Sequence, residues 1–362
     1  MILIVKIGTS SLTDYRGQVR QDVIERLCDQ VAETRATDLH VVLVSSGAIG
    51  AGLPALGYVE ERPRDARTLQ AASAVGQSRL MAGYERALGR HGLVAGQILL
   101  APFDFFERTQ YLHARGTLER LLQLGVVPII NENDAVADDA IRFGDNDRIA
   151  ALVANLLGAD RLVLLTDTDA LYTSDPKTDA SAAQIREIRS IADELPVTAG
   201  GAGTDRGSGG MASKVQAARM AAYSGVTTVI AAAEQEDVVR GSLAEHPEFG
   251  TIVRPQPRPL SARKLWIGFA VEPQGQLVVD DGAQRALRRD GGSLLAVGVK
   301  DFSGAFGRGD AVDVAGTDGT ILGRGLAAVS SQEMAAIVGV RSSDHPVGTP
   351  DEVIHRDELV IL

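Results

Sequence analysis

The chain has a single cysteine, Cys28, among its 362 residues. One thiol excludes a disulfide framework, and it also excludes a metal cluster built from cysteines. Cys28 falls within a helical pattern rather than in a turn. Chains without disulfides are typical of a reducing compartment, so a cytoplasmic location is expected.

Long apolar runs are absent as well. No stretch approaches the roughly 20 apolar residues that a membrane-spanning helix needs, so no membrane partner is expected. The first residues, 1–6, carry no basic segment before their apolar stretch and no small-residue cleavage site. They predict a strand rather than a signal peptide. The net charge of −11 argues against a general nucleic-acid binder.

Lysine is scarce, since 31 of the 36 basic residues are arginine and five are lysine. Two of these lysines nevertheless lie beside glycine: Lys6 precedes Gly8, and Lys214 follows Gly209 and Gly210. An ammonium group is a compact point charge, whereas a guanidinium group is a broad planar fork. Either lysine alone is explained by chance placement on the surface. Together with the motifs below, the pair indicates a polyphosphate site.

Short apolar runs alternate with helical patterns through about the first 255 residues. The runs are continuous, as in strands that are buried on both faces. They lie at Ile2–Val5, Val41–Val44, Gln97–Leu100, Val126–Ile130, Leu162–Leu165 and Thr227–Ala231. The helical patterns lie at Asp22–Thr34, Arg67–Leu88, Arg108–Leu124, Asp147–Leu157 and Met211–Ser224. This alternation predicts an α/β fold, a three-layer αβα sandwich with a mostly parallel sheet.

A second, smaller domain is predicted after a proline-rich stretch. Three prolines within residues 254–259 indicate a linker, which we place at 256–274 after a first domain at 1–255. Beyond it, short apolar runs separated by glycine-rich turns predict a mostly β, barrel-like domain over 275–350. Residues 351–362 are predicted to be a C-terminal tail.

Polar residues follow four predicted strands, at the ends where open α/β sheets bind their ligands. These segments are 6–11, 45–52, 131–134 and 166–169. Turn formation explains any one of them, including Asn131 and Asp134. It explains poorly why a lysine, hydroxyls, amides and carboxylates are all found at one edge.

Several features of this edge favour phosphoryl transfer. Gly8 and the glycines at 47, 50 and 52 permit backbone N–H groups to approach an anion, although no P-loop or dinucleotide fingerprint is present. A helix needs one capping residue, yet 145–147 reads Asp-Asn-Asp. The six histidines lack ligand-like spacing, and no serine–histidine–acid arrangement is evident. Phosphoryl transfer needs mainly positioning and charge neutralisation, and oxygen ligands suit Mg²⁺ with substrate phosphates.

With these residues assembled, the chain resembles the amino acid kinase family, and within it the members that phosphorylate glutamate. The resemblance spans nearly the whole length. It rests on the segments 6–10, 45–48, 130–136, 144–147, 164–167, 171–176 and 209–214. The region from about 275 to 350 resembles the PUA domain that many of these proteins carry.

The resemblance implies a reaction and its participants. The reaction would be ATP-dependent phosphorylation of the γ-carboxylate of L-glutamate, giving L-glutamyl 5-phosphate in the first step of proline biosynthesis. L-Proline would inhibit it, and the chain would form a homo-oligomer, either a dimer or a tetramer. Mg²⁺ would bridge the phosphates of ATP, and no direct protein ligand to the metal is assigned.

The resemblance also implies roles for individual residues. Lys6 and Lys214 would neutralise charge on the transferring phosphoryl group, and Asp147 would hold both lysines in place. Glutamate would be bound by Ser46, Asp134 and Asn146, with Asn131 nearby. ATP would be bound by Lys6, Gly8, Thr166, Asp167, Ser208, Gly209, Gly210, Met211, Ala212, Ser213 and Lys214.

Two alternatives stay open. One is another kinase of the same fold, acting on aspartate, N-acetylglutamate, carbamate or a nucleoside monophosphate. The other is an RNA-binding or regulatory protein that uses its C-terminal domain. Residues 275–362 hold eight Lys or Arg and thirteen Asp or Glu, a charge of −5, which disfavours binding to a phosphate backbone. A role in regulation or assembly is expected for this domain instead.

Overall fold

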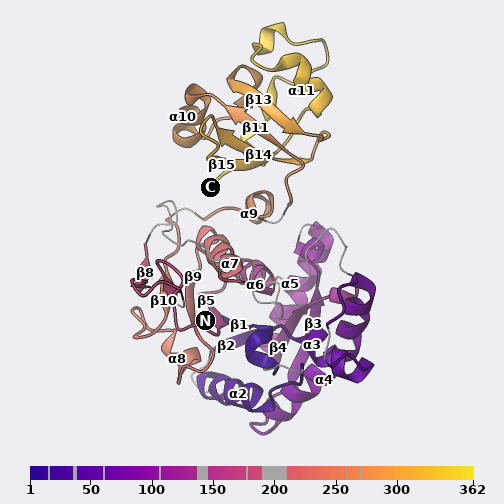
Figure 1. Cartoon of the computed structure of the whole chain (residues 1–362), viewed down its shortest axis with the longest axis vertical. Helices are drawn as coiled ribbons and strands as arrows, with labels where there is room; N and C mark the ends of the chain where they lie inside the picture. Colours follow the sequence, from indigo (N-terminus) through magenta and orange to yellow (C-terminus); the bar gives the residue numbers. More distant parts are fainter. Residues whose placement is uncertain are drawn as a thin grey trace. The chain divides into compact units, whose positions relative to one another are not determined.

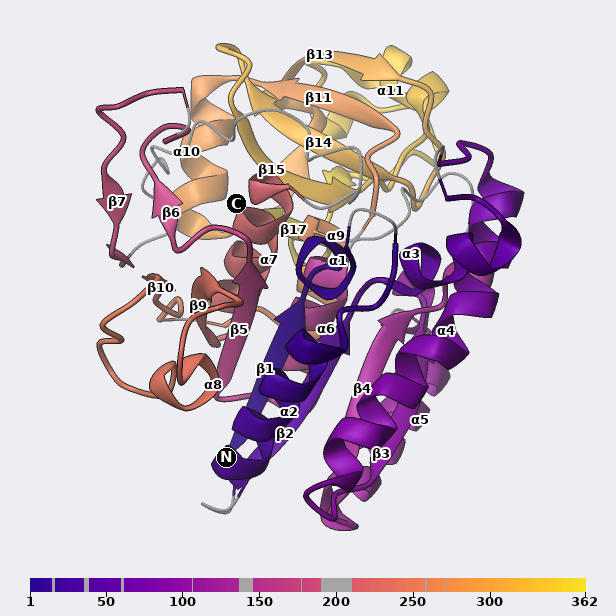
Figure 2. The same cartoon turned by 60° about the horizontal axis from the view of Figure 1, so that its bottom comes forward.

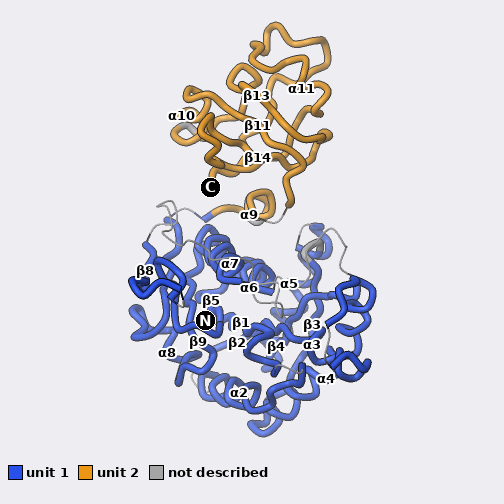
Figure 3. Tube along the Cα trace, viewed as in Figure 1, with its two compact units in different colours: residues 1–259 blue, residues 260–362 orange. Residues whose placement is uncertain are grey.

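The computed structural model describes residues 1–14, 17–35, 39–59, 62–105, 107–136, 146–176, 178–189, 210–257, 259–269 and 271–362. The chain forms two compact units, Met1–Pro259 (unit 1) and Leu260–Leu362 (unit 2), which Figure 3 distinguishes by colour. None of the described helices combines the length and the apolar character that crossing a bilayer would require.

Unit 1 is built on an eight-stranded sheet (Figure 1). In spatial order its strands are β3 (Ala95–Leu100), β4 (Val127–Glu132), β2 (His40–Ser45), β1 (Ile2–Ile7), β5 (Arg161–Thr166), β9 (Thr227–Ala232), β10 (Thr251–Val253) and β8 (Glu187–Ile188). The neighbouring strands β3, β4, β2, β1, β5 and β9 all run parallel, and β10 is antiparallel to β9. Two short strands, β6 (Leu171–Tyr172) and β7 (Gln184–Ile185), pair separately.

Helices cover both faces of this sheet. One face carries α2 (Gln21–Arg35), α4 (Ala66–Gly89) and the short α8 (Val238–Gly241), and the other carries α5 (Arg108–Gln123), α6 (Asn146–Leu157) and α7 (Met211–Tyr223). Figure 2 shows α2 lying along β1 and β2. Short helical segments fill the connections: α1 (Thr9–Leu12), α3 (Ala48–Gly52), η1 (Leu53–Leu56), η2 (Pro102–Phe105) and η3 (Asp134–Val136). The predicted three-layer αβα architecture is therefore confirmed.

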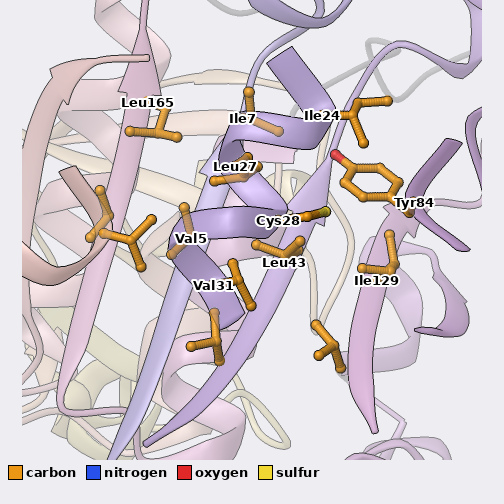
Figure 4. Packing of buried hydrophobic residues seen from close by; sticks show 14 of the residues in the cluster. Val5, Ile7, Ile24, Leu27, Cys28, Val31, Leu43, Tyr84, Ile129 and Leu165 are labelled. Atoms are coloured by element: carbon orange, nitrogen blue, oxygen red, sulfur yellow. The ribbon is translucent and has the colours of Figure 1, made fainter. Parts of the chain in front are cut away.

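The packing of β1 against α2 decides which way Lys6 points. Successive side chains of a strand point to opposite faces. Leu3, Val5 and Ile7 share a core cluster with the inner face of α2, and Figure 4 shows Leu27, Cys28 and Val31 around Val5 and Leu43, with Ile24 beside Tyr84. Lys6, between Val5 and Ile7, therefore points to the opposite face, where α6 packs against β1. Cys28 is fully buried, and burial raises the pKa of its thiol to about 12.

Two glycines bring α3 and α4 into direct backbone contact. A Cβ atom added to Gly52 would lie 1.8 Å from the carbonyl oxygen of Ala72, and one added to Gly76 would lie 1.8 Å from that of Ala48. Any larger residue would force the helices apart. Gly52, which the sequence grouped with anion-binding glycines, thus serves this helix crossing.

Unit 2 is mostly β, as predicted. Its five-stranded sheet has the order β13 (Val299–Gly304), β11 (Gly275–Val279), β14 (Ala311–Gly316), β15 (Ile321–Leu326) and β17 (Leu359–Ile361). A second pair joins β12 (Leu294–Leu295) to β16 (Glu352–Ile354). The remaining elements are α9 (Ala262–Phe269), α10 (Asp281–Asp290), α11 (Ser331–Ile337), η4 (Ala296–Gly298), η5 (Ser342–Asp344) and η6 (Arg356–Glu358).

Two segments differ from their predicted roles. The segment 256–274, predicted as a linker, contains α9, whose Leu265 and Ile267 are buried and which packs against β15 and β17. The segment 351–362, predicted as a tail, supplies β16 and β17. The prolines mark where unit 1 ends, but they do not show how soon the next packed element begins. The apolar side of α9 has to be buried against another element, and β17, the last strand of the chain, forms part of the surface that buries it.

Candidate active site

Three charged side chains meet at the carboxyl edge of the unit 1 sheet. The Nζ atom of Lys6, on β1, lies 2.6 Å from Oδ1 of Asp147, in the first turn of α6. The Nζ atom of Lys214, near the start of α7, lies 3.2 Å from Oδ2 of the same carboxylate. All three side chains are less than 8% exposed. The structure thus brings together the two lysines that the sequence singled out, with Asp147 between them.

The surroundings of Asp147 keep it ionised. Burial alone would raise the pKa of this carboxyl, but the ammonium groups of Lys6 and Lys214 outweigh burial, and the Ser213 hydroxyl donates a 2.7 Å hydrogen bond to Oδ2. The net result is a pKa lowered to about 2. Two ammonium groups and one carboxylate give this cluster a net charge of +1 near neutral pH.

Helix ends add to this positive character. Both α6 and α7 begin at the cluster, with Asn146 and Met211 as their first residues. The first backbone N–H groups of a helix have no partner within the helix, and its dipole makes this end positive. A Cβ atom at Gly8 would lie 3.6 Å from Lys6 Nζ, an ordinary contact distance, so the backbone of Gly8 lies directly beside the ammonium group. The arrangement suits an anion at this edge.

The end of β5 lies beside the Lys6 segment. Ile7 of β1 is in register with Leu165, and Thr166 and Asp167 follow directly. Thr166 is buried and its hydroxyl donates a 3.1 Å hydrogen bond to Oδ1 of Asp167, which is exposed. Of the predicted nucleotide residues, Thr166 and Asp167 thus lie at the end of β5, whereas Gly210, Met211, Ala212, Ser213 and Lys214 lie at the start of α7, which packs against α6 and β9. Ser208 and Gly209 lie outside the described residues.

Ser46 lies on the other side of β1, directly after β2. It is buried, and its backbone N–H donates a 3.1 Å hydrogen bond to the carbonyl oxygen of Ile7. Gly47 follows with φ +98°, a left-handed conformation that favours glycine, and α3 begins there. This turn holds Ser46 at the edge of the sheet next to the end of β1.

Asn131 and Asp134, at the end of β4, are held by side chains of α4. The Ser73 hydroxyl donates a 2.8 Å hydrogen bond to Oδ2 of Asp134, and Asn131 Nδ2 donates a 2.8 Å hydrogen bond to Oε1 of Gln77. All four residues are buried. Burial raises the pKa of Asp134, against the opposing effect of the Ser73 hydrogen bond.

Ser73 and Gln77 are absent from the sequence-based prediction. The sequence feature that could have indicated them is the pair of small residues Ala72 and Gly76. These residues let α4 contact α3 directly beside Ser73 and Gln77.

Asn146 connects the β4 end to the charged cluster. The backbone N–H of Glu132 donates to Oδ1 of both Asn131 and Asn146, at 2.9 and 3.1 Å. Asn146 precedes Asp147 in the first turn of α6, so the amides beside β4 and the lysine cluster form one continuous polar region. No group of three His, Cys, Asp or Glu side chains is placed to hold a metal ion within the described ranges.

Comparison with protein families agrees with this architecture. Residues 1–232 match the model of the amino acid kinase family, and residues 275–345 match the PUA domain. The chain belongs to the amino acid kinase family. Within this family it is 47% identical over 363 residues to the glutamate 5-kinase of Azoarcus sp., across 99% of this chain and 97% of that protein.

Further relatives have the same name. The glutamate 5-kinases of Trichlorobacter lovleyi and Pelobacter propionicus are 44% and 43% identical over 366 residues, covering 99% of this chain and 96% and 97% of theirs. Among solved structures, the T. acidophilum isopentenyl phosphate kinase product complex matches with a TM-score of 0.49 and 18% identity, over 70% of this chain and 100% of that one.

Proposed function

We propose that this amino acid kinase transfers the γ-phosphoryl group of ATP to the γ-carboxylate of L-glutamate, in the first step of proline biosynthesis. The observation that carries the proposal is the buried Lys6–Asp147–Lys214 cluster, which joins the amides and carboxylate beside β4 to the hydroxyl and carboxylate after β5. The relatives named glutamate 5-kinase, which match 99% of the chain, support it.

The chemistry needs charge neutralisation more than a base. An oxygen of the substrate γ-carboxylate forms a bond to the γ-phosphorus, the bond from that phosphorus to the bridging oxygen breaks, and ADP leaves. A carboxylate with a pKa of about 4.3 is already ionised near neutral pH, so no proton has to be removed. Lys6 and Lys214 neutralise the charge that spreads over the transferring group, and Asp147 keeps both ammonium groups in position.

The two substrates occupy opposite sides of the cluster in this proposal. Asp134 pairs with the ammonium group of glutamate, while Ser46, Asn146 and Asn131 hold its polar groups by hydrogen bonds. ATP lies over Gly8, Thr166, Asp167 and the start of α7, with Ser208 and Gly209 completing its site. The positive ends of α6 and α7 favour its phosphates.

Mg²⁺ fits this site as a companion of ATP. The oxygen donors present, such as the exposed Asp167 carboxylate, are the kind that Mg²⁺ prefers. Because no three-residue metal cluster is found among the described residues, the phosphates would supply most of the ligands. When bound, the ion neutralises phosphate charge.

Trapping the product with hydroxylamine tests the function directly. The purified chain, ATP and Mg²⁺ are incubated with L-glutamate, L-aspartate or N-acetyl-L-glutamate, and the hydroxamate formed from each acyl phosphate is measured. Free glutamate should give the highest kcat/KM. Absence of hydroxamate with free glutamate, together with turnover of another acid, would overturn the assignment. Adding L-proline to the same assay tests the predicted inhibition.

We also propose self-association through the β3 edge of unit 1. β3 ends the sheet, and Val94, Leu99, Leu112 and Leu124, on and around β3 and α5, are exposed. Exposed apolar groups beside an unpaired strand edge are typical of interfaces. Light scattering should give a dimer or larger assembly that Leu112→Glu weakens, whereas a monomeric native chain would contradict the proposal.

A further inference from the structure

Two buried polar atoms beside the proposed glutamate site have no hydrogen-bond partner among the described residues: Nε2 of Gln77 and Oδ1 of Asp134. Their residues are only 8% and 5% exposed. Buried donors and acceptors are nearly always paired, because leaving one unpaired forfeits its hydration without compensation. An unpaired donor and an unpaired acceptor in one network point to a ligand that carries the complementary groups.

The hydrogen bonds around these atoms fix their identities. Asn131 Oδ1 accepts from the backbone N–H of Glu132, so the other end of that amide is its donor, Nδ2. Nδ2 donates to Gln77, and the atom that receives it must be Oε1. The remaining atom of the Gln77 amide is therefore Nε2, a donor. Ser73 fixes Asp134 in the same way, by occupying Oδ2 and leaving Oδ1.

The two free atoms belong to one surface of α4 and the end of β4. Ser73 and Gln77 are four residues apart, so they share a face of the helix. Ser73 bonds to Asp134 and Gln77 bonds to Asn131. Only two residues lie between Asn131 and Asp134 in the chain. The network thus presents an anionic acceptor and a neutral donor from rigid, buried side chains.

We propose that Gln77 is a substrate-binding residue, whose Nε2 donates a hydrogen bond to the α-carboxylate of the amino acid while Oδ1 of Asp134 accepts from its α-ammonium group. An α-amino acid carries these two groups on one carbon, which matches one unpaired donor and one unpaired acceptor in this network. The γ-carboxylate is then left for the lysine cluster. Ser73 is a positioning residue that orients Asp134. This inference rests on the proposed function, and it assigns the α-carboxylate a partner.

The variant Gln77→Glu tests whether Gln77 binds the substrate or only orients Asn131. The variant keeps an oxygen to accept from Asn131 Nδ2, but it places a second acceptor where Nε2 was. With the new carboxyl group ionised, KM for glutamate should rise by about 10- to 100-fold, as for a lost hydrogen bond to a charged group. KM for ATP should stay within about twofold. A normal KM for glutamate would show that Gln77 only orients Asn131, and would overturn the inference.

Truncated ligands test the same contact without adding charge. Inhibition constants against glutamate are measured for 4-aminobutyrate, which lacks the α-carboxylate, and for glutarate, which lacks the ammonium group. Gln77→Met should weaken glutamate and glutarate by a similar factor, about tenfold or more, and leave 4-aminobutyrate within about threefold. Unchanged inhibition by glutarate, or an equal loss for 4-aminobutyrate and glutamate, would overturn the inference.

Ser73→Ala and Ser78→Ala form a matched pair on α4, because Ser78 is exposed and bonds only locally, to the carbonyl oxygen of Val75. Ser73→Ala should raise KM for glutamate by about three- to tenfold with little change in kcat, and Ser78→Ala should change neither. If the two variants behave alike, Ser73 does not position Asp134 for substrate binding. A wild-type chain that forms no hydroxamate from glutamate would instead refute the proposed function itself, so the two failures are distinguishable.

Discussion

The two units of this chain differ in where they keep their polar side chains. Seventeen polar or charged residues are buried in unit 1, and none is buried among the described residues of unit 2. The core of unit 2 is formed by aliphatic side chains with Phe306 and Met334. The ion pair of Arg308 with Glu333 lies at the surface, and that of Arg324 with Asp313 is partly buried.

This difference shows where the fold bears the energetic cost of buried polar groups. A buried polar group destabilises a fold unless it is paired. Most of the buried polar residues of unit 1 lie at the carboxyl edge of its sheet, where Asp147 pairs with two lysines and Ser73 of α4 donates a hydrogen bond to Asp134. The described residues of unit 2 carry no such cost.

The largest expected contrast is in the stability of buried and exposed ion pairs. Asp147→Asn leaves two buried ammonium groups without their carboxylate and should lower the free energy of unfolding of unit 1 by about 3–5 kcal/mol. Arg308→Gln breaks an exposed pair and should lower that of unit 2 by about 0–1 kcal/mol. The only tryptophan, Trp266, lies in unit 2. Denaturant titrations followed by its fluorescence and by far-UV circular dichroism should therefore resolve the two effects. Equal losses would contradict the contrast.

Substitutions of lysines in the two units should also differ in their effect on turnover. Lys214→Met should lower kcat by roughly 100- to 1,000-fold, because its charge matters most while the phosphoryl group is transferring, and should change KM for glutamate much less. Lys300→Met, at an exposed position on β13 of unit 2, is the matched control. Steady-state kinetics with glutamate and ATP measure both, and near-normal turnover of Lys214→Met would remove this lysine from the mechanism.

The polar edge of unit 1 should also depend on the glycine contact beneath it. Gly76→Ala would push α4 away from α3 and should lower the free energy of unfolding by about 1–3 kcal/mol, with a rise in KM for glutamate because Ser73 and Gln77 move. Gly116, on the exposed face of α5, has open space around it. Gly116→Ala should raise stability by about 0.5–1 kcal/mol. A stable Gly76→Ala with normal KM would show that the crossing does not position the site.

The smallest expected effect is a pH dependence that sets Asp134 apart from the acids of unit 2. Arg308 and Ser330 lower the pKa of Glu333 to about 2, whereas burial raises the pKa of Asp134 above 3.8. Binding of the substrate ammonium group needs ionised Asp134, so KM for glutamate should rise as pH falls through this raised pKa.

The stability contribution of Asp134 has the opposite sign. The folded state favours its protonated form, so this contribution is present at low pH and is lost as pH rises through the raised pKa. Asp134→Asn should raise KM for glutamate and remove the acid limb of its pH profile. If the acid limb of the pH profile is unchanged in Asp134→Asn, another group is responsible for it.

The sequence predicted most of the framework of unit 1 and the charged centre of its site. Continuous apolar runs identified β1, β2, β4, β5 and β9, which are buried on both faces, and also β3, which lies at the edge of the sheet and is only partly buried. Lys6 and Lys214 stood out because the chain otherwise uses arginine. Asp147 was assigned through the resemblance, and its contact with both lysines is a property of the fold.

The parts that the sequence did not predict depend on contacts between distant segments. Ser73 and Gln77 are ordinary polar residues of a long helix until the glycine crossing brings them to Asp134 and Asn131. Likewise, α9 packs on β15 and β17, β16 pairs with β12, and β17 pairs with β15, all through contacts between segments far apart in the chain. Local composition, such as the prolines at 255–259, carries no information about those partners.

The charged cluster has a consequence for how the chain is made. Lys6 is among the first residues synthesised, Asp147 comes midway, and Lys214 emerges near the end of unit 1. A nascent chain or a proteolytic fragment that stops before α7 has only one of the two ammonium groups that face the carboxylate. In the proposed mechanism such a fragment lacks one of the two charges that neutralise the transferring phosphoryl group, so we expect unfinished or damaged copies to consume little nucleotide.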